Sequence, residues 1–231
     1  MERLVNNVLF KKIMVVVAHP DDEVLGCGGS ISRWVGEGAE VRVLVLSDGL
    51  SNERTSCERE SKRRAFQNAI DCLGAKVCDI LDLPDQKFEI VNFQEIVQKI
   101  KKYIVAFSPD VIVTHWAGDL NRDHRIVNEA IHLVCRPLVS NDLKCLMTMY
   151  TASSSEFGDH FSRSSFDANL FVSLSKENLS KKFEALNFYA EEVSRMQNLR
   201  NKHYLRALAT VAGGRVGREL AESFRIEWAR V

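Results

Sequence analysis

The chain has 231 residues, of which 45% are hydrophobic and 27% charged, as in an ordinary soluble globular protein. Lysine plus arginine and aspartate plus glutamate number 31 each, and this zero net charge argues against nucleic acid or an anionic membrane as the main partner. Every apolar run is far below the roughly 18 residues of a membrane-spanning helix, and the N-terminus lacks a signal-peptide pattern. We therefore expect a cytoplasmic protein with no transmembrane segment and with reduced cysteines.

Alternating strands and helices fill the first two thirds of the chain. Continuous β-branched runs predict buried strands, and apolar residues at helical spacing predict amphipathic helices. In chain order we expect a strand over 13–19, a helix over 24–38, a strand over 41–49, a helix over 55–73, a strand over 77–83, a helix over 93–107, a strand over 111–116 and a helix over 123–134. This alternation predicts a Rossmann-like, mostly parallel sheet with helices on both faces.

The last third continues the same organisation. The sequences CLMTMYT and NLFVSL predict strands over 145–151 and 169–174, and an apolar stripe predicts a long helix over 176–197. The sequence contains no repeat, no low-complexity segment and no linker rich in proline and glycine. We therefore expect a single α/β domain over residues 1–231.

An unusual group of acids follows the first predicted strand, in the sequence AHPDDE. Neighbouring carboxylates repel each other, and a turn needs only one of them. The first and fourth strands of such a sheet are commonly neighbours where the strand order reverses, so we expect His19, Asp21, Asp22, Asp123 and His124 to converge. Two imidazoles and one carboxylate, with open positions for water, are typical of catalytic zinc. The spare carboxylate of Asp21 then accepts a proton from water as a general base.

These motifs resemble the PIG-L/LmbE-like family of zinc-dependent N-deacetylases. The resemblance rests on AHPDDE and the downstream DH pair, supported by VLSDG, GDLNRDHR, SSSE and the closing GRELAESFRI. It implies that His19, Asp22 and His124 bind the metal, that Asp21 is the general base, and that Asp123 orients His124. It also implies that the substrate is an N-acetylated amino sugar, commonly an N-acetylglucosaminyl group, either free or linked to a lipid or nucleotide, which loses acetate.

One position departs from the family pattern. Many members have His-Pro-Asp-His where this chain has Asn-Arg-Asp-His, so Asn121 stands at the position of the first histidine. An amide donates a hydrogen bond to an oxyanion but does not deliver a proton at neutral pH. The proton for the leaving amine then comes from Asp21 or from His115, and we favour Asp21.

Other residues and properties keep two interpretations each. Arg54, after the second strand, either binds sugar hydroxyls or a phosphate group of the substrate, or lies on a solvated face. His115 is either a substrate contact or a polar residue at a strand end. Iron in place of zinc is open, because geometry and metal availability both decide, and a homo-oligomer is open because relatives often associate.

Three alternatives to a deacetylase also account for the acidic cluster. The acids simply cap the next helix, or they hold magnesium in a phosphohydrolase. In the third, the protein is a non-catalytic module that binds a sugar or nucleotide and keeps a structural metal. Two histidine ligands favour zinc over magnesium, and an Asp21 that does not bind the metal has no use in a structural site.

Overall fold

The computed structural model describes residues 10–49, 55–136, 143–158, 165–189 and 199–230. Within these ranges, no helix is both long and apolar enough to span a lipid bilayer.

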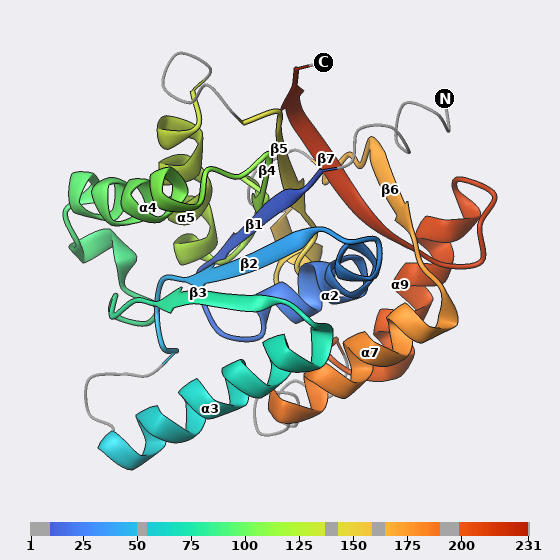
Figure 1. Ribbon diagram of the computed structural model, residues 1–231, viewed down its shortest axis with the longest axis horizontal. Coiled ribbons are helices and arrows are strands. Elements are labelled where there is room, and N and C mark those ends of the chain that lie inside the picture. Colours follow the sequence, from blue (N-terminus) through green and yellow to red (C-terminus); the bar gives the residue numbers. More distant parts are fainter. Residues whose placement is uncertain (1–9, 50–54, 137–142, 159–164, 190–198, 231) are drawn as a thin grey trace.

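A seven-stranded sheet forms the centre of the molecule, in the order β3-β2-β1-β4-β5-β7-β6 (Figure 1). The strands are β1 (Lys12–Val17), β2 (Glu40–Val45), β3 (Lys76–Ile80), β4 (Val111–His115), β5 (Cys145–Met149), β6 (Leu170–Ser173) and β7 (Ala221–Ala229). The first five pair in parallel, whereas β7 runs antiparallel to both β5 and β6. The predicted mostly parallel sheet is confirmed, and so is the expectation that the first and fourth strands are neighbours.

Helices cover both faces of this sheet, as predicted (Figure 1). They are α2 (Asp22–Gly36), α3 (Ser56–Leu73), α4 (Phe93–Phe107), α5 (Arg122–Val134), α7 (Lys176–Leu186) and α9 (Lys202–Gly214), with the short 3₁₀ turns η1 (Phe88–Ile90), η2 (Ser155–Phe157) and η3 (Asn187–Tyr189). Helices α4 and α5 pack on one face and enclose one apolar core, whereas α2, α3, α7 and α9 enclose a second core on the other.

The C-terminal third differs most from the prediction. The helix expected over 176–197 ends at Leu186 and continues as η3 to Tyr189, and residues 190–198 lie outside the described residues. Helix α9 and strand β7 were not predicted. Strand β7 inserts between β5 and β6, so the C-terminal segment lies inside the sheet and not at its edge.

A buried ion pair bridges a break in α2, the helix that begins at the acidic cluster. The backbone at Cys27 leaves the helical region, with φ −146° and ψ 22°. Beyond the break, the N–H groups of Gly29 and Ser30 donate to the Glu222 carboxylate at 3.1 and 2.6 Å. The Lys182 ammonium, 2.6 Å from Glu222, donates at 2.9 Å to the carbonyl two residues before the break. The pair therefore satisfies backbone groups on both sides of the interruption.

Candidate metal centre and active site

The site forms where β1 and β4 end beside each other. Their parallel pairing aligns Ile13 with Val111, so both strands deliver their following loops to the same edge of the sheet. One hydrogen bond joins the two ends directly, since the backbone N–H of Ala18 donates to Nε2 of His115 at 2.9 Å. This edge is where ligands bind in open parallel sheets.

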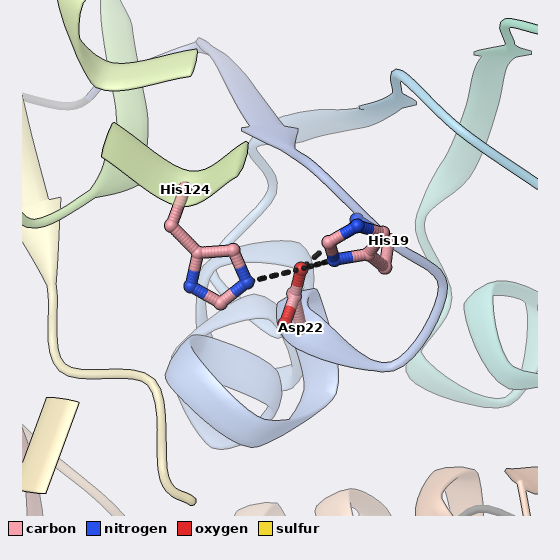
Figure 2. A group of neighbouring side chains, drawn as sticks. All are labelled: His19, Asp22 and His124. Carbon is pink, nitrogen blue, oxygen red and sulfur yellow. Dashed lines mark hydrogen bonds and ion pairs between the residues drawn. The ribbon is translucent and has the colours of Figure 1, made fainter. Parts of the chain in front are cut away.

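Three side chains that the family resemblance names as metal ligands converge here. Oδ2 of Asp22 lies 3.5 Å from Nδ1 of His19 and 3.2 Å from Nε2 of His124 (Figure 2). One ligand atom from each of the three lies within 4.8 Å of the other two. The residues are 9%, 2% and 2% exposed in the order His19, Asp22, His124. Residues about a hundred positions apart therefore form one buried cluster.

A second carboxylate lies close to the far nitrogen of each imidazole. Nε2 of His19 lies 3.0 Å from Oδ2 of Asp123, and Nδ1 of His124 lies 3.2 Å from Oδ1 of Asp119. Such pairs fix the orientation of metal-binding histidines and raise their basicity. The structure thus places Asp123 beside His19 and not beside His124, because consecutive residues of a helix point in different directions. The carboxylate that faces Nδ1 of His124 is that of Asp119.

Asp119 is itself held from several directions. Its carboxylate accepts hydrogen bonds from the hydroxyls of Ser154 and Ser155, the latter at 2.6 Å, and from the backbone N–H of Asn121 at 2.8 Å. Burial opposes its ionisation, but the charge on His124 and these donors together lower the pKa of Asp119. The loop after β5 therefore helps to keep this carboxylate ionised against His124.

The electrostatics of the cluster favour a cation. Burial opposes charge on the two imidazoles, but the surrounding carboxylates outweigh it and raise the pKa of His19 to about 9 and that of His124 to about 10. Although Asp22 is buried, the charge on His124 keeps the pKa of Asp22 well below its usual range. In the metal-free chain, one proton on His19 and one on His124 thus supply positive charge beside these carboxylates. Two imidazoles and a carboxylate fit a zinc ion, which would replace those protons.

Asp21, the predicted general base, directly precedes Asp22 and is held by contacts of its own. It precedes α2 with a left-handed backbone (φ 105°), and its N–H donates to Oε2 of Glu23 at 3.1 Å. Its carboxylate oxygen Oδ2 accepts a hydrogen bond from Nη1 of Arg200 at 2.5 Å. Burial raises the pKa of Glu23 to about 8, and the Tyr189 hydroxyl donates to its other oxygen at 2.7 Å.

His115 lies behind His124 and is not exposed at the surface of the site. Its ring stacks on that of His124 with centroids 3.8 Å apart and is fully buried. Nε2 accepts the hydrogen bond from Ala18, and Nδ1 lies 3.2 Å from the hydroxyl of Thr151. Burial lowers the pKa of His115 to about 3. A neutral ring with both nitrogens engaged inside the protein supports His124, and it is poorly placed for the alternatives of touching substrate or donating a proton.

Two more predicted residues have different outcomes. Asn121 caps α5, because its Oδ1 accepts the N–H of Asp123 at 2.9 Å. This contact fixes the amide and leaves Nδ2, the donor atom, without a partner among the described residues. Arg54 lies outside the described residues.

Several residues at the site were not found from the sequence. Besides Asp119, they include Asp85, whose Oδ1 lies 3.3 Å from Nε2 of His19, as well as Arg200 and Tyr189. Asp119 and Asp85 lie in loops that follow predicted strands, so their positions at the sheet edge could have identified them as site residues. Arg200 and Tyr189 carry no local signal, because tertiary packing alone brings them to the site.

A family model matches residues 14–135, and its description is "PIG-L: GlcNAc-PI de-N-acetylase". The matched segment contains both AHPDDE and the downstream DH pair, and it covers more than half of the chain.

Curated relatives of the chain carry the word deacetylase in their names, as two examples show. The uncharacterized deacetylase YaiS of Escherichia coli is 28% identical over 133 residues, which are 55% of this chain and 70% of that protein. A 1D-myo-inositol 2-acetamido-2-deoxy-alpha-D-glucopyranoside deacetylase of Rhodococcus erythropolis is 46% identical over 43 residues, which are 19% of this chain but only 15% of that protein.

The fold is also present among solved structures. The N,N'-diacetylchitobiose deacetylase of Pyrococcus horikoshii superposes with a TM-score of 0.71 at 20% identity, covering 97% of this chain and 90% of that one. At this level of identity, the likeness establishes the architecture, whereas the chemistry depends on the site residues.

Proposed function

The chain belongs to the PIG-L family, the GlcNAc-PI de-N-acetylases, and from this membership we propose that it hydrolyses the N-acetyl group of an amino sugar or its conjugate, releasing acetate and a free amine. The observation that carries the proposal is the buried cluster of His19, Asp22 and His124, with the separate carboxylate of Asp21 beside it. A cluster that served only structure has no need of an additional base.

His19, Asp22 and His124 would hold the metal, and their two nitrogens and one oxygen favour zinc. When bound, a zinc ion would polarise the amide carbonyl and make an adjacent water more acidic. The carboxylates behind the imidazoles, Asp123 and Asp119, would keep both rings oriented for a cation bound between them.

The remaining chemistry is assigned to two side chains. Asp21 accepts the proton of the attacking water and returns it to the nitrogen of the leaving amine. Asn121 has its amide oxygen fixed by the start of α5, so its Nδ2 donates to the carbonyl oxygen as negative charge develops there. His115 takes no part in proton transfer in this scheme, because it stays neutral and fully buried.

The direct test incubates the purified protein with an N-acetylglucosaminide and, separately, with a phosphomonoester. The proposal expects acetate from the first and no phosphate from the second, with zinc content measured on the same sample. Asp21→Asn should retain zinc and lose turnover by about 10²- to 10⁴-fold, the usual contribution of a general base. Phosphate release, or full activity in Asp21→Asn, would overturn the assignment.

A further inference from the structure

A carboxylate next to a cation site binds the cation unless another contact holds it away. Asp21 and Asp22 are adjacent in the sequence, and both are buried, 4% and 2% exposed. Oxygen atoms of either residue are acceptable zinc ligands. If Asp21 turned toward the cation, it would fill a position needed by water and would no longer be available as a base. Some contact must therefore hold Asp21 in its own place.

We propose that Arg200 is a positioning residue that keeps the Asp21 carboxylate off the metal and directed at the attacking water, an inference that rests on the proposed deacetylase function. Nη1 of Arg200 contacts Oδ2 of Asp21 at 2.5 Å, and Nε of the same guanidinium donates to Oγ of Ser153 at 2.8 Å. The two hydrogen bonds fix the plane of the guanidinium, so it presents a rigid donor to the carboxylate.

The fold fixes both Ser153, which contacts the Arg200 guanidinium, and the backbone next to Arg200. Ser153 lies in the loop after β5 with a left-handed backbone (φ 75°) and is 8% exposed. Arg200 directly precedes Asn201, whose side chain caps α9 by accepting the N–H of Tyr204 at 2.8 Å. The guanidinium therefore joins three separate parts of the fold at one point: the loop after β1, the loop after β5 and the start of α9.

The backbone of Asp21 completes the restraint. Its N–H donates to Glu23, which in turn accepts the hydroxyl of Tyr189. The contact with Glu23 thus restrains the main chain of Asp21, and the contact with Arg200 restrains its side chain. Arg200 and Tyr189 come from the C-terminal third, which explains how a segment without metal ligands contributes to the active site.

A competing role for Arg200 is direct contact with the substrate, since its side chain is 19% exposed. The two roles differ in their dependence on Asp21. A residue that acts through Asp21 loses its effect once Asp21 is replaced by the uncharged amide, whereas a substrate contact keeps its effect in that background.

The test uses Arg200→Met and the milder Arg200→Lys, each also combined with Asp21→Asn. Lys202→Met is the matched control, because Lys202 is an exposed cation two residues away. We expect Arg200→Met to lower kcat by about 100-fold with KM within about twofold, the effect of a misplaced catalytic group. Arg200→Lys should lie between wild type and Arg200→Met, because lysine retains the charge but not the fork of donors.

Cobalt substitution provides a readout that does not depend on activity. Tetrahedral Co²⁺ absorbs visible light more strongly than Co²⁺ with five or six ligands. We expect weaker absorption in Arg200→Met, as Asp21 adds to the ion, and no such change when Asp21→Asn is also present or in Lys202→Met. An unchanged cobalt spectrum in Arg200→Met, or an equal loss of kcat with and without Asp21→Asn, would overturn the proposal. If the wild type released no acetate, the proposed function would fail, and the cobalt spectra would still decide the role of Arg200.

Discussion

Replacing Glu222 with glutamine tests the ion pair that spans the break in α2. The side chains of Lys182 and Glu222 are each 6% exposed and 2.6 Å apart. Glutamine has nearly the same shape as glutamate, so Glu222→Gln removes the charge with little change in volume. The remaining ammonium of Lys182 would then be buried without a counter-charge, and the glutamine NH₂ group would face another donor.

The expected loss follows from the contacts of the Glu222 carboxylate. It accepts hydrogen bonds from Lys182, from Gly29 and from Ser30, and the glutamine oxygen can keep only part of this set. Hydrogen bonds to charged groups contribute about 1.5–3 kcal/mol each, and breaking a buried ion pair costs about 3–5 kcal/mol. We therefore expect unfolding to become easier by about 4 kcal/mol, or a fall in Tm of about 8–16 °C for a chain of this size.

The assay is urea unfolding of the metal-free protein followed by circular dichroism, with Glu219→Gln as the matched control. Glu219 pairs with Lys176 at 3.3 Å, but the two side chains are 68% and 77% exposed, so the control should change stability by less than about 0.5 kcal/mol. Lys182→Met combined with Glu222→Gln should cost less than the sum of the single changes. Equal losses for Glu222→Gln and Glu219→Gln, or strict additivity in the double variant, would refute the reasoning.

Four further predictions concern the metal centre and the residues around it. The pKa of His19 is raised to about 9 and that of His124 to about 10, so zinc displaces two protons when it binds below pH 9. The affinity for zinc, measured by chelator competition, should therefore rise up to about 100-fold per pH unit in this range. A zinc affinity that does not depend on pH would contradict this. The same shift makes the metal-free chain lose stability as pH rises from 6.5 through 9, since protonated His19 is favoured only in the folded state, and Tm measured across this range checks the sign. Asp119→Asn and Asp123→Asn should each weaken zinc binding about 10- to 100-fold, because each carboxylate orients one histidine. An unchanged zinc affinity in both variants would contradict this orienting role. Asn121→Asp keeps the helix cap but loses the donor, so kcat should fall about 100-fold with zinc retained, whereas an unchanged kcat would exclude it as an oxyanion donor.

The sequence was sufficient for the central sheet and for the meeting of its first and fourth strands. Buried β-branched runs and amphipathic helices alternate regularly there, so topology follows from local pattern and the switch-point rule. That rule also brought His19, Asp22 and His124 together from positions about a hundred residues apart, as the structure shows.

The partners of these residues were harder to predict, because they depend on side-chain direction. Asp123 is adjacent to His124 in the sequence, yet it faces His19, while Asp119 turns back toward His124 from the preceding loop. Neighbouring positions on a helix diverge by about 100°, so sequence adjacency is a poor guide to contact within α5.

The C-terminal third shows a different limit of the sequence. Strand β7 has apolar residues at alternate positions, Phe224, Ile226 and Trp228, which is a strand signal that was missed. The contact of Arg200 with Asp21 has no such signal, since it joins residues 179 positions apart through the packing of α9.

The central claim is that a cation binds between His19, Asp22 and His124, and zinc titration of the metal-free protein tests it most directly. Isothermal calorimetry and elemental analysis should find one zinc per chain, and Asp22→Ala and His124→Ala should each abolish tight binding while Asp21→Asn retains it. A chain that takes up no zinc, or whose zinc uptake is unaffected by Asp22→Ala and His124→Ala, would contradict the account.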